Sequence, residues 1–232
     1  MSTIPETVRA QVPTADKRSP MSGIAALPAG GRNDAALHSI LAPSIFFGSR
    51  SPLAEPRSFG MSCGIWFVLV AIATLGRLWQ PGWNITPLAG AALAAGALFP
   101  NPLLAASVPL GALAISNLAL PAYGGFAMAA VVYAATAWPV VLGGLLRGGR
   151  LLPIVGGALA SSLVFYIVTN FAHWCLTDDY PRTAGGLLAC YWAALPFYRW
   201  MPIGDVAWSL AFFGGITAVD RLARGLTARG TN

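Results

Sequence analysis

The sequence predicts an all-α fold, a polytopic membrane helix bundle with about six transmembrane helices and one short interfacial or re-entrant helix. Hydrophobic residues make up 56% of the chain and charged residues only 9%, against about 25% charged in soluble domains. Residues 78–146 contain no Asp, Glu, Lys or Arg. A chain of 24.1 kDa cannot bury such a length in one soluble core, whereas about 20 apolar residues cross a bilayer.

The first sixty residues have a different composition from the rest. They are rich in Pro, Ser and Arg, and their apolar patches are short and interrupted. No basic start, continuous apolar run and small-residue cleavage site follow one another as in a signal peptide. Two interpretations remain open for 1–60, a disordered cytoplasmic tail or a true start at Met61. The transmembrane helical domain is expected at 61–226, and 227–232 is expected to be a cytoplasmic tail.

Six apolar runs follow, and each is bounded by a residue pattern that ends a helix. The first closes at its Arg77 anchor, and the second, rich in Ala and Gly, ends at "FPNP" because proline cannot continue the helical hydrogen-bond ladder. The third ends at "PAYGG", the fourth at "RGGR", the fifth before the polar "HWCLTDDYP", and the last in "DRLARG". The predicted spans are 62–78, 85–99, 103–120, 126–146, 151–172 and 203–222.

Arginine distribution predicts the sidedness of these spans. With the N-terminus inside, seven arginines fall on cytoplasmic ends and three on the outer side, as the positive-inside rule requires. The inner set is Arg50, Arg57, Arg147, Arg150, Arg221, Arg224 and Arg229, and the outer set is Arg77, Arg182 and Arg199. We therefore expect a multi-pass protein of the inner (plasma) membrane with both termini cytoplasmic.

The segment Ala184–Tyr198 is apolar but only fifteen residues long, and it contains Pro196. We interpret it as the interfacial or re-entrant helix on the outer side. The alternative is a seventh span, which would place the C-terminal arginines outside.

Polar residues at membrane depth predict a ligand-binding site. Such residues usually face the bundle interior or a water-filled cavity. Taken alone, Asn84 and Asp205 would each most simply cap a helix. In this topology, however, all the polar residues within the spans fall on the outer half of the membrane. Together they indicate an outward pocket for a small solute. Trp174 and Tyr180 are expected in its lid. The predicted ligand-binding residues are Asn84, Thr86, Asn117, Thr169, Asn170, Trp174, Tyr180 and Asp205.

The stretch "TNFAHWCLTDDYP" carries reactive residue types without a catalytic or metal-binding pattern. His173 and Cys175 do not belong to a CxxC, HxxxH or HExxH motif. No GxSxG elbow and no P-loop occurs in the chain. We therefore predict no catalytic residue, no metal, no cofactor and no enzyme activity, and the absence of a basic stripe interleaved with aromatics argues against nucleic acid as a partner. Asp178 and Asp179 are expected to be rim charges that pair with Arg182.

Two cysteines, Cys175 and Cys190, both fall on the outer side in this topology. A disulfide between them would close a short loop, and the sequence leaves open whether they pair.

A resemblance to a known family rests on five motifs in order. They are Arg77, "NITPLAGAALAAGALF", "TNFAHW", "YPRTAGGLLACYWAALPF" and the later "GD". Over residues 65–222 the chain resembles bacterial six-span membrane proteins known only as a domain of unknown function. That family has Asn–Phe–Thr–Pro where this chain has 84–87. It has Ser–Asp where this chain has Ser116 and Asn117, so the aspartate that could serve a cation or proton role is missing here. The layout is also similar to the substrate-binding membrane subunits of energy-coupling-factor vitamin transporters, which implies six helices and outward loops over a pocket.

Two functional classes follow for a protein whose first partner is the lipid bilayer. One is a subunit that binds or transports a small-molecule solute, which would need a partner ATPase module. The other is a structural or assembly protein that binds another membrane protein through its outer aromatic loop. A membrane enzyme is a third and weaker alternative. The sequence does not identify a ligand, an oligomeric state or a partner protein.

Overall fold

A computed structural model of the protein describes residues 59–79, 84–121 and 123–229. These residues belong to one of the two units into which the chain divides. The predicted tail at 1–60 lies outside the described residues except for its last two, which already belong to the first helix. The C-terminal tail predicted at 227–232 is likewise outside from residue 230, while 227–229 continue the last helix.

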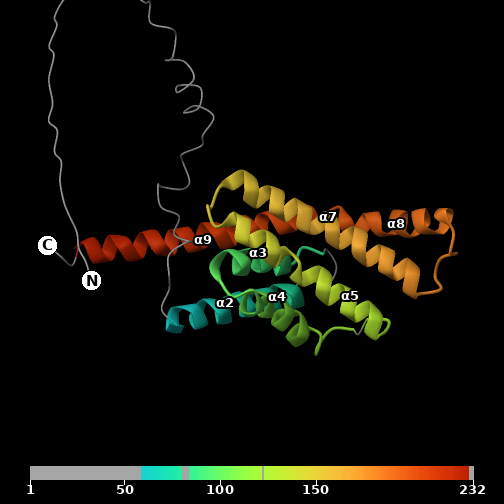
Figure 1. Ribbon diagram of the computed structural model, residues 1–232, viewed down its shortest axis with the longest axis horizontal. Helices are drawn as coiled ribbons and strands as arrows, with labels where there is room; N and C mark the ends of the chain where they lie inside the picture. Colours follow the sequence, from blue (N-terminus) through green and yellow to red (C-terminus); the bar gives the residue numbers. More distant parts are fainter. Residues whose placement is uncertain (1–58, 80–83, 122, 230–232) are drawn as a thin grey trace, which may run out of the picture. The chain divides into compact units, whose positions relative to one another are not determined.

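The described residues form helices and contain no strand, which confirms the all-α class (Figure 1). In order, the helices are α2 (Phe59–Trp79), α3 (Leu88–Leu98), α4 (Pro102–Ser116), α5 (Phe126–Ala137), α6 (Pro139–Gly143), the 3₁₀ turn η2 (Gly144–Leu146), α7 (Leu151–Leu176), α8 (Ala184–Tyr198) and α9 (Met201–Arg229).

Four stretches are long and apolar enough to cross a membrane. They are Phe59–Trp79, Phe126–Leu146, Leu151–Leu176 and Met201–Ala223. The second of these is α5, α6 and η2 in succession, with a join at Pro139, whose nitrogen cannot donate a hydrogen bond. These four stretches indicate a membrane protein.

The predicted second and third spans are shorter than expected, so six full-length spans are not confirmed. The run 85–99 yields α3, whose 11 residues rise only about 16 Å, roughly half of the hydrocarbon thickness. The run 103–120 yields α4, whose 15 residues end at Ser116 because the chain turns there to contact α2.

Helix α3 lies in the core and is buried on every side, with all nine residues from Gly90 to Leu98 buried. It packs on α4, α6 and α9. Its small side chains allow this: a Cβ on Gly96 would overlap the Val140 carbonyl oxygen of α6, and one on Gly90 would lie 2.9 Å from the Ser209 nitrogen of α9. The apolar run therefore reflects burial within protein rather than contact with lipid on one face.

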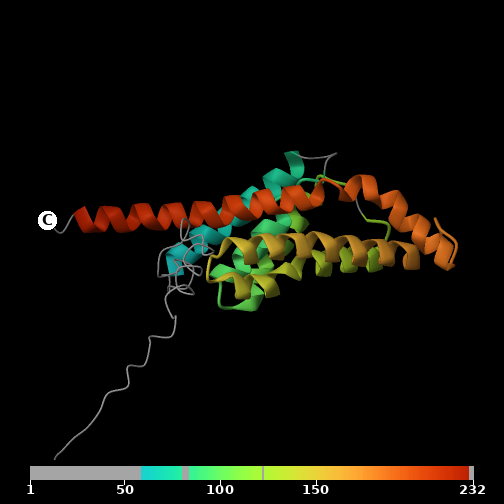
Figure 2. The ribbon, with the colours of Figure 1, turned by 90° about the horizontal axis from the view of Figure 1, so that it is seen from above.

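Helix α8 has the bounds predicted for the short outer helix and returns along the second half of α7 (Figures 1 and 2). The Tyr166 hydroxyl of α7 donates to the Tyr191 carbonyl at 2.6 Å, and the Tyr191 hydroxyl donates to the Ile167 carbonyl at 2.8 Å. The Thr183 hydroxyl caps the start of α8 by accepting from the Gly186 nitrogen. Only two residues separate α8 from α9.

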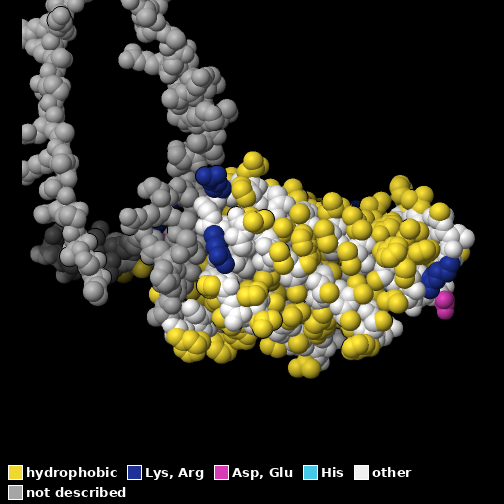
Figure 3. Space-filling model, viewed as in Figure 1, with side chains coloured by type: hydrophobic (Ala, Val, Ile, Leu, Met, Phe, Trp, Pro, Cys, Tyr) yellow, Lys and Arg dark blue, Asp and Glu magenta, His cyan; other side chains and the backbone are white. Residues whose placement is uncertain are grey.

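The helix ends and connections gather at two opposite ends of the bundle. In Figure 1, α2 begins, α9 ends and the α5–α7 connection turns on the same side, whereas the α7–α8 connection lies on the opposite side. Figure 3 shows a largely apolar face whose basic side chains gather near its two ends. This arrangement is that of a bundle with an apolar middle for lipid.

We expect the C-terminus and the α7–α8 connection to lie on opposite sides of the membrane. Alkaline phosphatase, which is active only in the periplasm, should be inactive when fused after Asn232 and active when fused after Asp179. An active enzyme at Asn232 would contradict the predicted cytoplasmic C-terminus.

Candidate functional site

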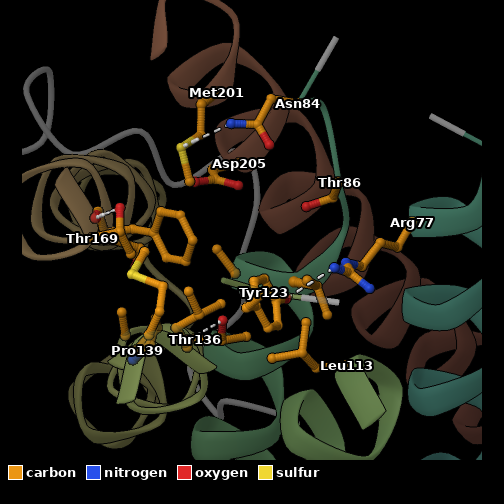
Figure 4. A pocket seen from close by; sticks show the side chains of 17 residues that line it. Arg77, Asn84, Thr86, Leu113, Tyr123, Thr136, Pro139, Thr169, Met201 and Asp205 are labelled. Atoms are coloured by element: carbon orange, nitrogen blue, oxygen red, sulfur yellow. Dashed lines mark hydrogen bonds between the residues drawn. The ribbon is translucent and has the colours of Figure 1, made fainter. Parts of the chain in front are cut away.

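A cavity of about 330 Å³ lies among α2, α3, α4, α5, α7 and α9, within the size range of about 300–1,000 Å³ typical of small-ligand sites. Its walls are mainly apolar and include Leu113, Val132 and Phe165. Polar groups enter from six separate segments (Figure 4). They belong to Arg77, Asn84, Thr86, Tyr123, Thr136, Ser161, Thr169 and Asp205.

Arg77 reaches this cavity from the last turn of α2. Its Nη1 donates to Ser116 Oγ at 2.6 Å and to Asn117 Oδ1 at 2.8 Å, and its Nη2 donates to the Tyr123 hydroxyl at 3.1 Å. All three acceptors are neutral. Among the residues that the structure describes, no carboxylate forms an ion pair with Arg77. Its positive charge, permanent in proteins, is therefore hydrogen-bonded but not neutralised.

Asp205 enters the cavity from the first turns of α9 and is only 2% exposed. Its Oδ2 accepts a 2.6 Å hydrogen bond from the Ser162 hydroxyl of α7. Within the described ranges no basic side chain pairs with it. In Figure 4, Asp205 and Arg77 lie on different sides of the cavity, with Thr86 labelled between them. The site thus presents one carboxyl group and one guanidinium to a shared space.

The segment before α3 brings Asn84 and Thr86 to the cavity. Asn84 has a left-handed backbone with φ 54°, a conformation that Asn tolerates better than most residues. Its amide points to the Met201 sulfur at 3.7 Å. The following Ile85 packs on α9, where a Cβ on Gly204 would lie 2.8 Å from the Ile85 Cγ2 atom.

The capping interpretation of Asn84 and Asp205 is wrong. The N-cap position of α3 is Pro87, which has no side-chain hydrogen bond to the helix. Asp205 is the fifth residue of α9 and binds Ser162 of another helix instead of its own backbone. The predicted helix starts, 85 and 203, differ from the observed starts by three and two residues, and a carboxyl group beyond the first turn of a helix has no free N–H groups to cap.

The structure brings four of the predicted ligand-binding residues to the same cavity. Asn84, Thr86, Thr169 and Asp205 all line it. The Thr169 hydroxyl donates to the Phe165 carbonyl at 2.7 Å, which leaves its lone pairs free to accept. Asn117 does not line the cavity but holds Arg77 there.

The other predicted residues lie elsewhere. Asn170 and Tyr180 line a shallower hollow of about 290 Å³ between α7 and α8, which shares Thr169 and Met128 with the main cavity. The Asn170 amide donates to the Tyr166 carbonyl of its own helix at 2.7 Å.

Trp174 lines neither the main cavity nor this hollow. Its Nε1 donates to the Pro181 carbonyl at 2.9 Å, and the Arg182 guanidinium lies 5.7 Å from its ring centroid. The side chain thus closes the α7–α8 loop on itself.

The acidic pair in this loop divides between two partners. Asp178 Oδ1 lies 3.7 Å from Arg182 Nη2, as predicted, whereas Asp179 Oδ2 lies 3.0 Å from His173 Nε2. No group of three His, Cys, Asp or Glu side chains within the described part of the chain could hold a metal ion.

We expect Asp178→Asn to leave thermal stability and ligand binding unchanged, because its carboxylate is fully exposed. A loss of either would place chemistry at this rim.

Arg77, Tyr123 and Ser162 belong to the site or support it but are not among the predicted ligand-binding residues. The sequence predicts Arg77 as an interface anchor at the end of the first span. One signal was available, because Arg77 is the single charged residue between Arg57 and Arg147, and an isolated charge inside such an apolar length usually has a functional role.

Cys175 of α7 and Cys190 of α8 are free thiols in the structure, so the disulfide is not formed there. Cys175 is exposed, whereas Cys190 is buried and its thiol faces the Asn170 carbonyl at 3.5 Å.

We expect a maleimide reagent to label Cys175 much faster than Cys190 in the folded protein. Single Cys→Ser variants assign each signal. The unfolded protein should give three labelled thiols without reductant, matching its three cysteines, and a count that rises on reduction would show a disulfide.

These features define an all-helical protein of membrane type with a polar cavity inside its bundle. The chain belongs to a family of unknown function, DUF6580, whose model matches residues 58–226. This agrees with the resemblance to an uncharacterised family. No curated protein and no solved structure matches the chain, so the similarity to vitamin-transporter subunits has no support from these comparisons.

Proposed function

We propose that the protein binds a small polar solute in the main cavity and serves as a solute-binding or transport subunit of the plasma membrane. The observation that carries this proposal is that the Arg77 guanidinium and the Asp205 carboxyl group line one cavity, and that neither forms an ion pair with a described residue.

The energetic argument rests on the cost of charge at membrane depth. Ionised side chains within spans are expensive and are retained mainly where they pair, face water or act on a substrate. Asp205 is nearly fully buried and has one neutral partner. A ligand that fills the cavity would supply the missing partners, as expected for a site with apolar walls and a few convergent polar groups.

The hollow between α7 and α8 supports an entry from that side. It adjoins the cavity through Thr169 and Met128, and α8 with the preceding loop covers it. With the α7–α8 connection outside, the pocket faces outward. Active transport would need a partner ATPase module, because the sequence contains no P-loop.

Native mass spectrometry of the purified protein tests this proposal. We expect a bound small molecule in the wild type and none in a double variant, Arg77→Gln with Asp205→Asn. Asp178→Asn with Arg182→Gln is the matched control, because it removes one acid and one base from the exposed loop. If the wild type carries no ligand and no solute raises its melting temperature, the proposal is wrong.

A second candidate function is an assembly protein that binds another membrane protein. It is favoured by one stripe on α8, where Leu188 and Trp192 are exposed one turn apart. Lipid contact accounts for the same stripe. If Leu188→Ser with Trp192→Ser releases a co-purifying membrane protein while no ligand is found, the assembly function replaces the first.

A further inference from the structure

We propose that the ligand is a small zwitterion, with an anionic group held by Arg77, a cationic amine held by Asp205 and an apolar body between them. This inference rests on the proposed function and names the substrate class for that site.

The cation of the site is arranged for an anionic group. The three acceptors that hold the Arg77 guanidinium are neutral and come from α4 and from the loop after it. Guanidinium carries five N–H donors in a rigid fork that suits a carboxylate. The three hydrogen bonds fix the orientation of the guanidinium. They use two donors of Nη1 and one of Nη2, so Nε and the second Nη2 donor are left for a ligand.

The anion of the site is arranged for a cationic group. Asp205 Oδ2 is held by Ser162, and the described residues offer Oδ1 no hydrogen-bond donor. Oδ1 is not among the fully enclosed polar atoms that lack a partner, and Asp205 lines the cavity, so a ligand there is the available source of a donor. An ammonium group supplies both the donor and the charge that this oxygen lacks.

The apolar lining of the cavity indicates what kind of surface the ligand presents between its two charged groups. Apart from its polar groups, the cavity is walled mainly by apolar side chains, among them Leu88, Leu113, Val132 and Phe165. These side chains favour methylene or aromatic surface over further polar groups. A ligand with only one charge would leave the opposite charge of the site buried without a partner, which is a strong penalty in a low-dielectric site.

Isothermal titration calorimetry on the purified protein tests this inference with a series of linear ω-amino acids of increasing chain length, from glycine to 6-aminohexanoate. Each member is compared with the n-alkylamine and the n-alkanoic acid of equal chain length. We expect the best zwitterion to bind at least about 30-fold more tightly than either matched compound, the lower bound for loss of a buried charged partner. The chain length of the best binder measures the spacing of the two charged subsites.

The variants should shift this selectivity in opposite directions. In Asp205→Asn the zwitterion and the matched acid should bind equally, and in Arg77→Gln the zwitterion and the matched amine should bind equally. Asp178→Asn and Arg182→Gln, the matched loop variants, should keep the wild-type preference. Because each comparison is made within one variant, a general loss of folded protein cannot imitate the crossed pattern.

The outcomes separate the two proposals. If no probe binds, a co-purified ligand that carries both an amine and an acid supports the inference with a different body. If a probe or co-purified ligand binds with one charge, or none, as tightly as with two, the zwitterion inference is overturned while the proposed binding function stands. Absence of any ligand in both measurements overturns the proposed function itself.

Discussion

Gly143→Ala is expected to destabilise the protein by at least about 3 kcal/mol, at the upper end of the overpacking range. A Cβ at this position would overlap the Leu93 carbonyl oxygen and lie 2.8 Å from the Gly96 Cα atom of α3. These neighbours are backbone atoms of a helix that is enclosed by α4, α6 and α9, so they cannot move aside without disturbing the whole core. Thermal unfolding in detergent measures the effect.

The adjacent glycine provides the control for this substitution. Gly144→Ala meets no atom within 4 Å and should change the melting temperature little. Gly96→Ala, on the other side of the same crossing, should match Gly143→Ala because its Cβ would overlap the Val140 carbonyl oxygen. Equal melting temperatures for Gly143→Ala and Gly144→Ala would show that α3 and α6 do not cross at these glycines.

Small residues at 90–97 allow close helix packing, and the structure shows such packing at Gly90 and Gly96. The length and setting of α3 were not predictable in the same way. A helix buried on all sides has no polar face, so its composition equals that of a lipid-facing span. Helix α3 is short because it begins only after Pro87 and stops before the turn at Pro100. Only the three-dimensional packing shows that a half-length helix fills the core.

The candidate site was predictable where polar residues interrupt apolar runs. Asn84, Thr86, Thr169 and Asp205 were selected on that ground, and they line one cavity. Arg77 escaped selection because a basic residue at the end of a span has an ordinary explanation as an interface anchor. Its part in the cavity depends on α4 ending at Ser116, which no local pattern revealed.

Arg77→Leu is expected to lower the free energy of unfolding by about 3 kcal/mol, because three hydrogen bonds to a charged donor group are lost and each contributes about 1.5–3 kcal/mol before the chain relaxes. The same substitution should free the connection between α4 and α5, since Arg77 binds Asn117 at its start and Tyr123 near its end. Thermal unfolding gives the first effect, and amide hydrogen exchange of residues 117–120 and 123–125 gives the second.

Two further substitutions separate the effect of the Arg77 hydrogen bonds from that of its positive charge. One changes Arg77 itself, and the other is a control on the exposed loop. Arg77→Gln keeps donors that can reach Ser116 or Asn117, so it should restore part of the stability and of the exchange protection without the positive charge. Arg182→Leu, on the exposed loop, should change neither. If Arg77→Leu leaves stability and exchange as in the wild type, the contacts with Ser116, Asn117 and Tyr123 do not hold the loop. The guanidinium would then be retained for the ligand alone, because an uncompensated charge at this depth has no structural reason to remain.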